Sequence, residues 1–291
     1  MKFKKLGILM VILSVVMMGI VIAEDGTTAV TITNTAPSID SIELNDGSTG
    51  DNAITLTAAT TTTITCAGTA SDADGATDIT GVSGVIYSAN SAEGSADDPA
   101  DHYSDSDCGY NSGDGSYSCS FDVQFYGDAA LWTCSATATD ASSATGSDTD
   151  TATVGTLLAL DIPDATNIDF GSLSVGQNIA TPTVVYENEG NVVMDVTVDA
   201  WETAGTGDSS NSFTCTSGTQ PIANFRASLT SGAYSSYTSM VATGSVTLDS
   251  NLAQQTTGST PTSDTIYFGM EISSGASGSC TGVVSINAIA G

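Results

Sequence analysis

SYSCSFDVQF, residues 116–125, alternates regularly between apolar and polar side chains. In an extended chain, successive side chains point to opposite faces. Cys119, Phe121 and Val123 therefore share one face of this segment, and Asp122 lies on the other. An alternation with period two indicates a β-strand with one face in a core and the other in water.

The same period recurs along the chain. LWTCSATAT, residues 131–139, places Trp132 and Cys134 on its inner face. Further runs occur at residues 61–70, 81–89, 192–200 and 266–272. Clusters of Gly, Asp and Ser separate the runs, and a helical period is absent beyond residue 23. Short alternating strands between turn-forming clusters predict an all-β protein of antiparallel β-sandwiches.

The N-terminus has the pattern of a secretory signal. Lys2, Lys4 and Lys5 precede an apolar run at residues 6–23, which ends in VIA before Glu24. We expect residues 1–23 to form a signal helix that is removed, leaving a secreted or cell-surface protein without membrane insertion. The alternative is a retained leader that tethers the chain, although an apolar run of about 18 residues is at the short end for spanning.

Composition divides the rest of the chain into three parts. Residues 24–36 are a Thr-rich lead-in, and GTLLALDIPD at residues 155–164 is typical of an exit from a first domain. We predict one β-sandwich at residues 37–155 and a second at residues 156–291, because each segment has an ordinary domain length.

The charge of the chain is strongly unbalanced. It has 33 acidic residues against four Lys and Arg, and a formal net charge of −29. Removal of residues 1–23 leaves Arg226 as the only Lys or Arg. Such a chain repels nucleic acid and anionic lipid and attracts cations. We therefore expect no nucleic-acid partner, and a stability that depends on salt or on bound cations.

Short motifs resemble known families of surface proteins. APSI at residues 36–39, ASDADG at 70–75 and WTCSATATD at 132–140 resemble the immunoglobulin-like repeats of prokaryotic surface proteins, the PKD- and cadherin-like group. FGSLSVG at residues 170–176 and NEGN at 188–191 resemble the ASH/MSP-like immunoglobulin folds. These resemblances imply two tandem immunoglobulin-like sandwiches, and they imply no reaction.

Six cysteines in an exported chain indicate disulfides rather than zinc. The resemblance implies that Cys66 and Cys134 lie on strands B and F of the first sandwich, although Trp132 does not match the strand-C Trp of immunoglobulins. The implied pairs are Cys66–Cys134, Cys108–Cys119 and Cys215–Cys280. The alternative within the first sandwich is Cys66–Cys119 with Cys108–Cys134.

DADGATD, residues 72–78, is the most specific chemical pattern. Asp72, Asp74 and Asp78 around Gly75 are similar to the start of loops that bend carboxylates around calcium. The later bidentate Glu of an EF-hand is missing. In cadherin-like repeats a D-x-D-G turn can carry calcium between domains, so the resemblance implies calcium here. The alternative is an Asp/Gly turn without a metal.

A second acidic segment surrounds the only histidine, His102. Its carboxylates include Asp101, Asp105 and Asp107, which are oxygen ligands suited to calcium. One histidine adds little support for a transition metal. The alternative is a solvated loop closed by a disulfide between Cys108 and Cys119.

Catalytic patterns are missing from the sequence. A nucleophilic Ser or Thr needs a base, and the chain has one His and no G-x-S-x-G segment. We therefore expect a non-enzymatic structural or interaction protein of the cell envelope, with envelope proteins, glycans or further copies of itself as partners. The alternative is an adhesin that binds glycan or protein through loops such as residues 89–115. A secreted enzyme or inhibitor is a third hypothesis.

Overall fold

The computed structural model describes residues 30–47, 52–164, 167–202, 212–241, 244–258 and 260–291. The expected signal segment and residues 24–29 of the Thr-rich lead-in lie outside the described residues. The regular structure is almost entirely β-strand, which confirms the predicted fold class. Within the described ranges, no helix has the length and apolar character needed to cross a membrane. Residues 35–291 form one compact unit that holds two β-sandwiches.

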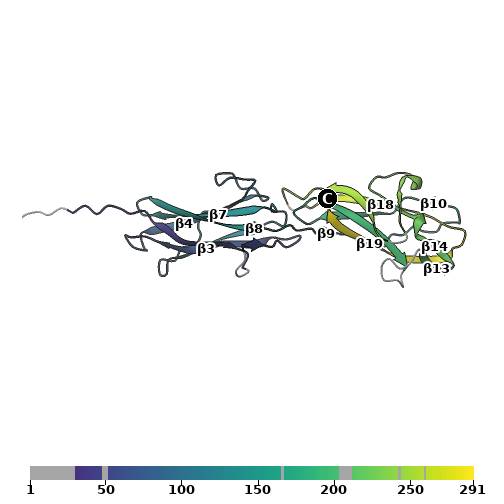
Figure 1. Ribbon diagram of the computed structural model, residues 1–291, viewed down its shortest axis with the longest axis horizontal. Coiled ribbons are helices and arrows are strands. Elements are labelled where there is room, and N and C mark those ends of the chain that lie inside the picture. The colour runs from purple at the N-terminus through teal and green to yellow at the C-terminus, as the bar shows by residue number, and fades with distance from the viewer. Residues whose placement is uncertain (1–29, 48–51, 165–166, 203–211, 242–243, 259) are drawn as a thin grey trace, which may run out of the picture. The chain divides into compact units, whose positions relative to one another are not determined.

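The first sandwich has two sheets that face each other as layers (Figure 1). One sheet consists of β1 (Ser38–Asn45), β3 (Thr62–Ser71) and β6 (Ser116–Val123). The other consists of β2 (Ala53–Ile54), β8 (Thr145–Val154), β7 (Leu131–Asp140), β4 (Ile79–Ser88) and β5 (His102–Asp105). Only the short β2 runs parallel to its neighbour, β8, and all other pairs are antiparallel.

The alternating segments occupy this sandwich as the sequence predicts. In β6, Tyr117, Cys119, Phe121 and Val123 are buried, and the residues between them are exposed. In β7, Trp132 is fully buried and its indole N–H donates to the Asp128 carbonyl at 2.8 Å. A buried polar N–H needs such a partner. The inner faces of both sheets contribute to one hydrophobic core.

Two disulfides lie inside this core. Cys66 of β3 is joined to Cys134 of β7 and so connects the two sheets, and Cys108 is joined to Cys119 of β6. All four of these cysteines are fully buried. The third disulfide joins Cys215 to Cys280. These are the pairs that the resemblance implies, and every cysteine is paired.

Gly84 in β4 packs against the Cys108–Cys119 disulfide. A Cβ atom at Gly84 would lie 2.4 Å from the sulfur of Cys119, closer than carbon and sulfur can approach. We expect Gly84→Ala to lower the free energy of unfolding by about 1–3 kcal/mol, the usual cost of overpacking a core. Gly81→Ala in the same strand is the matched control, because a Cβ there meets no atom within 4 Å. Equal denaturation midpoints for the two variants would refute this packing.

The second sandwich also has two sheets. One consists of β16 (Thr238–Ser239), β15 (Phe225–Ser228), β18 (Thr262–Glu271), β11 (Thr183–Asn188) and β9 (Leu160–Asp161), with β10 (Asn178–Ile179) also paired to β18. The other consists of β14 (Thr219–Pro221), β13 (Ser212–Ser217), β19 (Ser277–Ala290), β12 (Met194–Glu202) and β17 (Val246–Leu252). Two short 3-10 turns, η1 (Ile222–Asn224) and η2 (Tyr234–Ser236), flank β15.

Aromatic rings fill the centre of the second core. Phe225 stacks on Phe268, with ring centroids 5.3 Å apart, and meets Phe213 and Phe170 edge to face. Such aromatic pairs stabilise the fold by more than the burial of their surface area alone would do. Phe225 therefore links side chains from both sheets and from the segment before β10.

Two details of this sandwich differ from the sequence pattern. Asp195 and Thr197, expected on the solvent face of β12, are both only 9% exposed. β12 is an inner strand between β19 and β17, and the Asp195 carboxylate accepts a hydrogen bond from Asn251 N at 2.8 Å. Cys280 shares its strand face by period two with Val284 and Ile286, yet it lies in an exposed part of β19.

The NEGN motif binds the chain segment that enters this sandwich. Asn191 is 3% exposed, accepts a hydrogen bond from Leu157 N and donates to the Gly155 carbonyl. Asn188 is fully buried and donates to the carbonyls of Val192 and Leu252. The two amides thus satisfy one main-chain N–H and three main-chain carbonyls through their side chains.

Candidate functional site

The DADGATD segment forms the turn between β3 and β4. Gly75 N donates to the Asp72 carbonyl at 3.1 Å, and Asp78 N donates to the Gly75 carbonyl at 2.9 Å. Gly75 has a φ of 124°, a conformation that side-chain-bearing residues rarely adopt. The Asp72 carboxylate accepts a hydrogen bond from Asp74 N at 2.7 Å. The residues therefore make the tight turn that their types favour.

Asp72 and Asp78 lie beside a carboxylate from a distant part of the chain. Asp140 ends β7, where it is the register partner of Ile79 in β4. One carboxylate oxygen from each of Asp72, Asp78 and Asp140 lies within 4.8 Å of the other two. We call these three residues the carboxylate cluster. Ala141 N donates to the Asp78 carbonyl at 2.9 Å, which ties the two turns together.

The burial within the carboxylate cluster is uneven. Asp140 is 2% exposed, and its Oδ1 accepts hydrogen bonds from Ser142 N and Ala144 N, both at 2.8 Å. Oδ2 of Asp72 is buried and has no hydrogen-bond partner. A buried carboxylate oxygen without a partner is costly. The chain has no Lys or Arg between residues 6 and 225 to neutralise these charges.

Asp74 has a different role from the one expected. Its Oδ2 accepts a hydrogen bond from Thr35 N at 2.7 Å, at the start of the compact unit. Its carboxylate is not among the three that converge. Sequence reasoning missed Asp140, because only the pairing of β4 with β7 brings it to the β3–β4 turn. The sequence signal that could have identified Asp140 is its position at the end of the alternating run at residues 131–139.

The pKa of Asp78 is raised above its usual value. Desolvation is the largest cause, followed by the negative charges of Asp72, Asp140 and Asp74. A carboxyl group whose pKa rises on folding binds protons more tightly in the folded protein than in the unfolded chain. Its contribution therefore destabilises the fold at neutral pH, and this penalty disappears as the pH falls.

We expect the stability of the protein, without added divalent ions, to respond to pH accordingly. Its melting temperature should rise as the pH falls from about 7 towards the raised carboxyl pKa values, which lie above the usual 3.8. Burial also raises the pKa of Asp101 and Glu189, so the trend has several contributors. Asp78→Asn should show a smaller rise than the parent in thermal scans with chelator present. Identical slopes for parent and variant would contradict the proposed repulsion.

The second predicted set, Asp101, Asp105 and Asp107, is not brought together in this way. Among the described residues, two groups of acidic side chains have converging oxygens, and neither includes them. Asp105 instead accepts hydrogen bonds from Asp107 N and Ser120 N. Desolvation, with the charges of Asp98 and Asp128, raises the pKa of Asp101. The second converging group, Asp161, Glu187 and Glu189, lies in the second sandwich.

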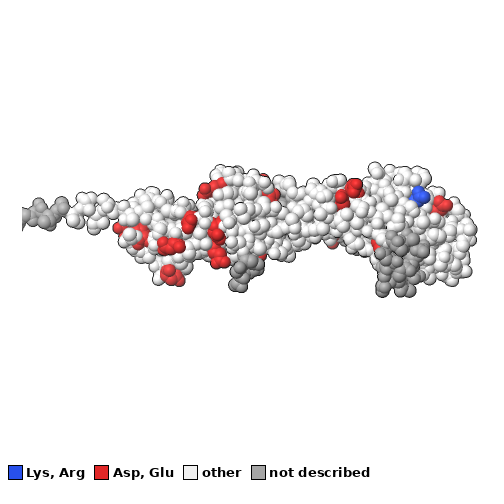
Figure 2. Space-filling view, viewed as in Figure 1, with Lys and Arg blue, Asp and Glu red and all other residues white. Residues whose placement is uncertain are grey.

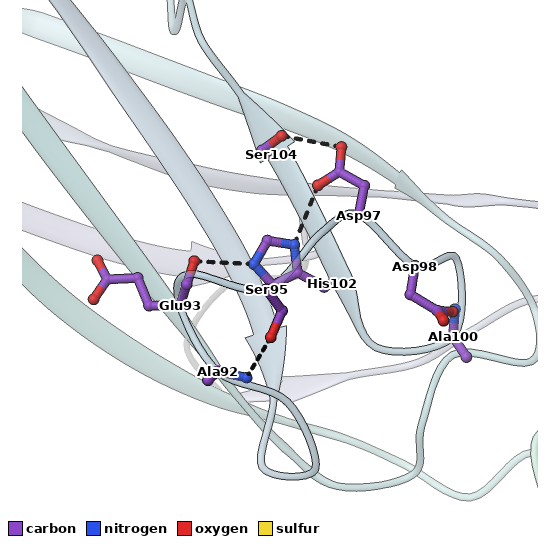
Figure 3. A network of polar contacts seen from close by, with 8 residues as sticks. All are labelled: Ala92, Glu93, Ser95, Asp97, Asp98, Ala100, His102 and Ser104. Carbon is purple, nitrogen blue, oxygen red and sulfur yellow. Dashed lines mark hydrogen bonds and ion pairs between the residues drawn. The ribbon is translucent and has the colours of Figure 1, made fainter.

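His102 holds the acidic loop in place (Figure 3). It is 2% exposed, with Nδ1 3.1 Å from Oδ1 of Asp97 and Nε2 3.1 Å from the Glu93 carbonyl. Both ring nitrogens are therefore within hydrogen-bond distance of an oxygen atom. The other oxygen of Asp97 accepts a hydrogen bond from Ser104. His102 therefore offers no free nitrogen to a metal or a substrate.

Acidic side chains gather over the first sandwich on the face shown in Figure 2. Arg226, the only described Lys or Arg, lies in the second sandwich, where its Nη1 donates to carbonyls of the η2 turn. Its guanidinium also stacks over the Tyr234 ring at 4.5 Å. Arg226 therefore holds a loop and neutralises no cluster of acids.

A groove of about 520 Å³ opens in the second sandwich. Its walls carry rings, polar groups and an aliphatic side chain, among them Phe170, Phe213, Asn167, Asp169 and Val284. The volume falls within the range of about 300–1,000 Å³ typical of small-ligand sites. A surface of this kind offers a ring to stack on and polar groups that fix orientation.

Comparisons with known proteins add only a distant likeness of fold. No family model and no curated protein matches the chain. A chain from a chaperone–tip adhesin complex of CFA/I fimbriae is similar over 79% of this chain and 75% of its own, at 8% identity and a TM-score of 0.32. A carbohydrate-binding module of the β-sandwich superfamily is similar over 89% of this chain and 98% of its own, at 14% identity and a TM-score of 0.27. Likenesses this distant carry no conclusion about function.

Proposed function

We infer that this protein is a secreted or cell-surface component of the cell envelope that works by binding or structural assembly. The observation that carries this inference is the pairing of all six cysteines into three disulfides. Such pairing is typical of proteins that fold in an oxidising compartment. On this proposal residues 1–23 are removed on export, and residues 37–155 and 156–291 are two domains of PKD/cadherin-like and ASH/MSP-like type.

The contacts that both ring nitrogens of His102 make support a non-catalytic role. Acyl transfer by Ser or Thr needs a base within hydrogen-bond reach of the nucleophile. Both nitrogens of His102 already contact Asp97 and Glu93. The carboxylates of Asp105, Asp114 and Asp140 accept hydrogen bonds from main-chain N–H groups and so stabilise turns. These three carboxylates are thus used to build turns.

The composition allows a selective cross-linking test on intact cells. No Lys follows Lys5, so the exported chain has carboxylates but no side-chain amines. A carbodiimide activates a carboxylate, which a partner amine then attacks to form an amide. We expect adducts with other envelope proteins and none between two copies through side chains. Adducts confined to cytosolic proteins after lysis, with none on intact cells, would refute the proposal.

A second candidate function is glycan binding at the groove of the second sandwich. Phe170 would stack on a sugar face, and the Asp169 carboxylate would accept hydrogen bonds from sugar hydroxyls. The Asn167 amide would accept hydrogen bonds from hydroxyls or donate to them. The loops at residues 89–115 are the alternative surface for such binding. Glycan-array binding that Phe170→Ala abolishes, and that His102→Gln in the acidic loop leaves intact, would favour the groove over these loops.

A further inference from the structure

We propose that the Cys215–Cys280 disulfide is a site of thiol–disulfide exchange, at which a small cationic thiol becomes attached to Cys280. The site borders the groove of the second sandwich, because Cys280 is one of the residues that line this groove. The inference is separate from glycan binding at the same groove, since it concerns a covalent reaction of the disulfide itself.

The first reason is that this disulfide differs from the other two in exposure. The four cysteines of the first sandwich are fully buried, whereas Cys280 is exposed and Cys215 is 9% exposed. A thiolate must reach a sulfur atom in order to attack it, and exposed disulfides are therefore the ones that exchange most readily. The Cys215–Cys280 disulfide is the one that an external thiol reaches first.

The second reason is the position of Cys280 on its strand. By period two it shares a face of β19 with Val284, which packs against the second core. This end of the face borders the groove, whose lining also includes Phe213 of β13 and Phe170. The groove volume of about 520 Å³ admits a small ligand. A small thiol in the groove therefore lies beside Cys280.

The third reason concerns the charge of the thiol. Asp169 lines the groove, and the described residues around it include no Lys, Arg or His. The chain as a whole has a formal net charge of −29. A field of this sign repels anionic thiols and raises the local concentration of cationic ones. The site therefore favours a small thiol with a positive charge.

The reaction needs no oxidant. The thiolate sulfur of the ligand attacks Sγ of Cys280 and forms a new S–S bond with it. The bond between Cys215 and Cys280 breaks, and its electron pair leaves on Sγ of Cys215, which then takes a proton from water. One disulfide is consumed and one is formed, so no net oxidation or reduction takes place.

The hydrogen bonds of the sheet remain when the S–S bond breaks. β19 pairs with β12 from Gly282 to Ala290, and it pairs with β13 around Cys280. β13 in turn pairs with β14. The disulfide is thus a covalent tie between the β13–β14 hairpin and β19, and we expect its exchange to loosen this hairpin without unfolding the sandwich.

The test uses the single Arg of the chain. Arg226 is the only Lys or Arg after Lys5, and Cys280 is the only cysteine in residues 227–291. After reaction with a thiol, free thiols are alkylated, and the protein is unfolded and cut with trypsin. Fragment 227–291 stays joined to the rest while the disulfide is intact, and it is released once the disulfide has opened. Its mass then shows whether Cys280 carries the added thiol.

The probes are cysteamine and mercaptoethanesulfonate, two-carbon thiols that differ in the charge of their end group. We expect cysteamine to release the fragment with one cysteamine on Cys280 and to leave an alkylated Cys215, while the cysteines of the first sandwich stay paired. At low salt and equal thiolate concentration, cysteamine should react about tenfold faster than the sulfonate, the low end of electrostatic steering. High salt should reduce this difference.

Two variants locate the reaction in the groove. Asp169→Asn removes the charge that lines the groove and keeps an oxygen acceptor for the Gly171 N–H. Asp122→Asn removes an exposed charge from β6 of the first sandwich. Asp169→Asn should reduce the preference for cysteamine more than Asp122→Asn does, because the nearer charge acts more strongly on the thiol.

Four results would overturn the proposal: a disulfide of the first sandwich opens first, the adduct is on Cys215, both probes react equally at low salt, or the two variants behave alike. Release of the fragment before any thiol is added would also overturn the proposed function, because the disulfide would then be missing. Failure of the exchange alone would leave the three disulfides, and with them the proposed function, in place.

Discussion

Replacing Cys66 and Cys134 together with Ala is expected to lower the free energy of unfolding by about 4 kcal/mol or more. The disulfide closes a loop of 68 residues, and in the chain-entropy model such a loop contributes about 4 kcal/mol. Both cysteines are fully buried between the two sheets, so the variant also loses packing in the core. Denaturant unfolding of parent and variant, with thiols blocked, measures the difference.

The Cys215–Cys280 disulfide provides the matched control. It closes a loop of 65 residues, so its loop-closure contribution is nearly the same. Cys280 is exposed, and removal of this disulfide takes less packing from a core. The loss from the first sandwich should therefore be the larger of the two. An equal or smaller loss for Cys66 and Cys134 would mean that the inter-sheet disulfide adds nothing through packing.

Phe225→Ala is expected to destabilise the second sandwich by about 3–5 kcal/mol, the usual cost of removing a buried aromatic ring. Phe225 is 1% exposed and contacts Phe268, Phe213 and Phe170. Its removal takes away one stacked and two edge-to-face contacts and leaves a cavity beside the groove. The measurement is denaturant unfolding, followed by the fluorescence of Trp201 at the end of β12.

Val175→Ala is the control for this variant, because Val175 is 58% exposed in the same sandwich. Its effect should stay within about 0.5 kcal/mol, as for most surface substitutions. A small effect for Phe225→Ala would show that the four rings do not form the centre of this core.

The elements that the sequence predicted well are those governed by local periodicity. β6 and β7 bury the residues that their period-two patterns place inward, because a strand in a sandwich has one face in the core and the other towards solvent. β12 follows this rule less well. It lies between β19 and β17, and its polar residues Asp195 and Thr197 are buried. Their burial depends on the position of the strand in the sheet, which the composition of the strand does not indicate.

The candidate site was predicted only in part, for the same reason. The turn at residues 72–78 follows from its Asp and Gly residues, which favour tight turns wherever they occur. The partner of Asp72 and Asp78 depends on the register of β4 against β7, which sets Ile79 opposite Asp140. Register is a tertiary property, fixed by packing on the inner face. Likewise, nothing in the sequence around His102 indicates that its two ring nitrogens contact Asp97 and Glu93.

The most direct test of the central claim is antibody labelling of intact cells that make this protein. An antibody raised against residues 35–291 should label intact, unpermeabilised cells or the material they release, and the labelled protein should contain no free thiol. Labelling that appears only after permeabilisation, of a protein with free cysteines, would contradict an envelope protein built on three disulfides.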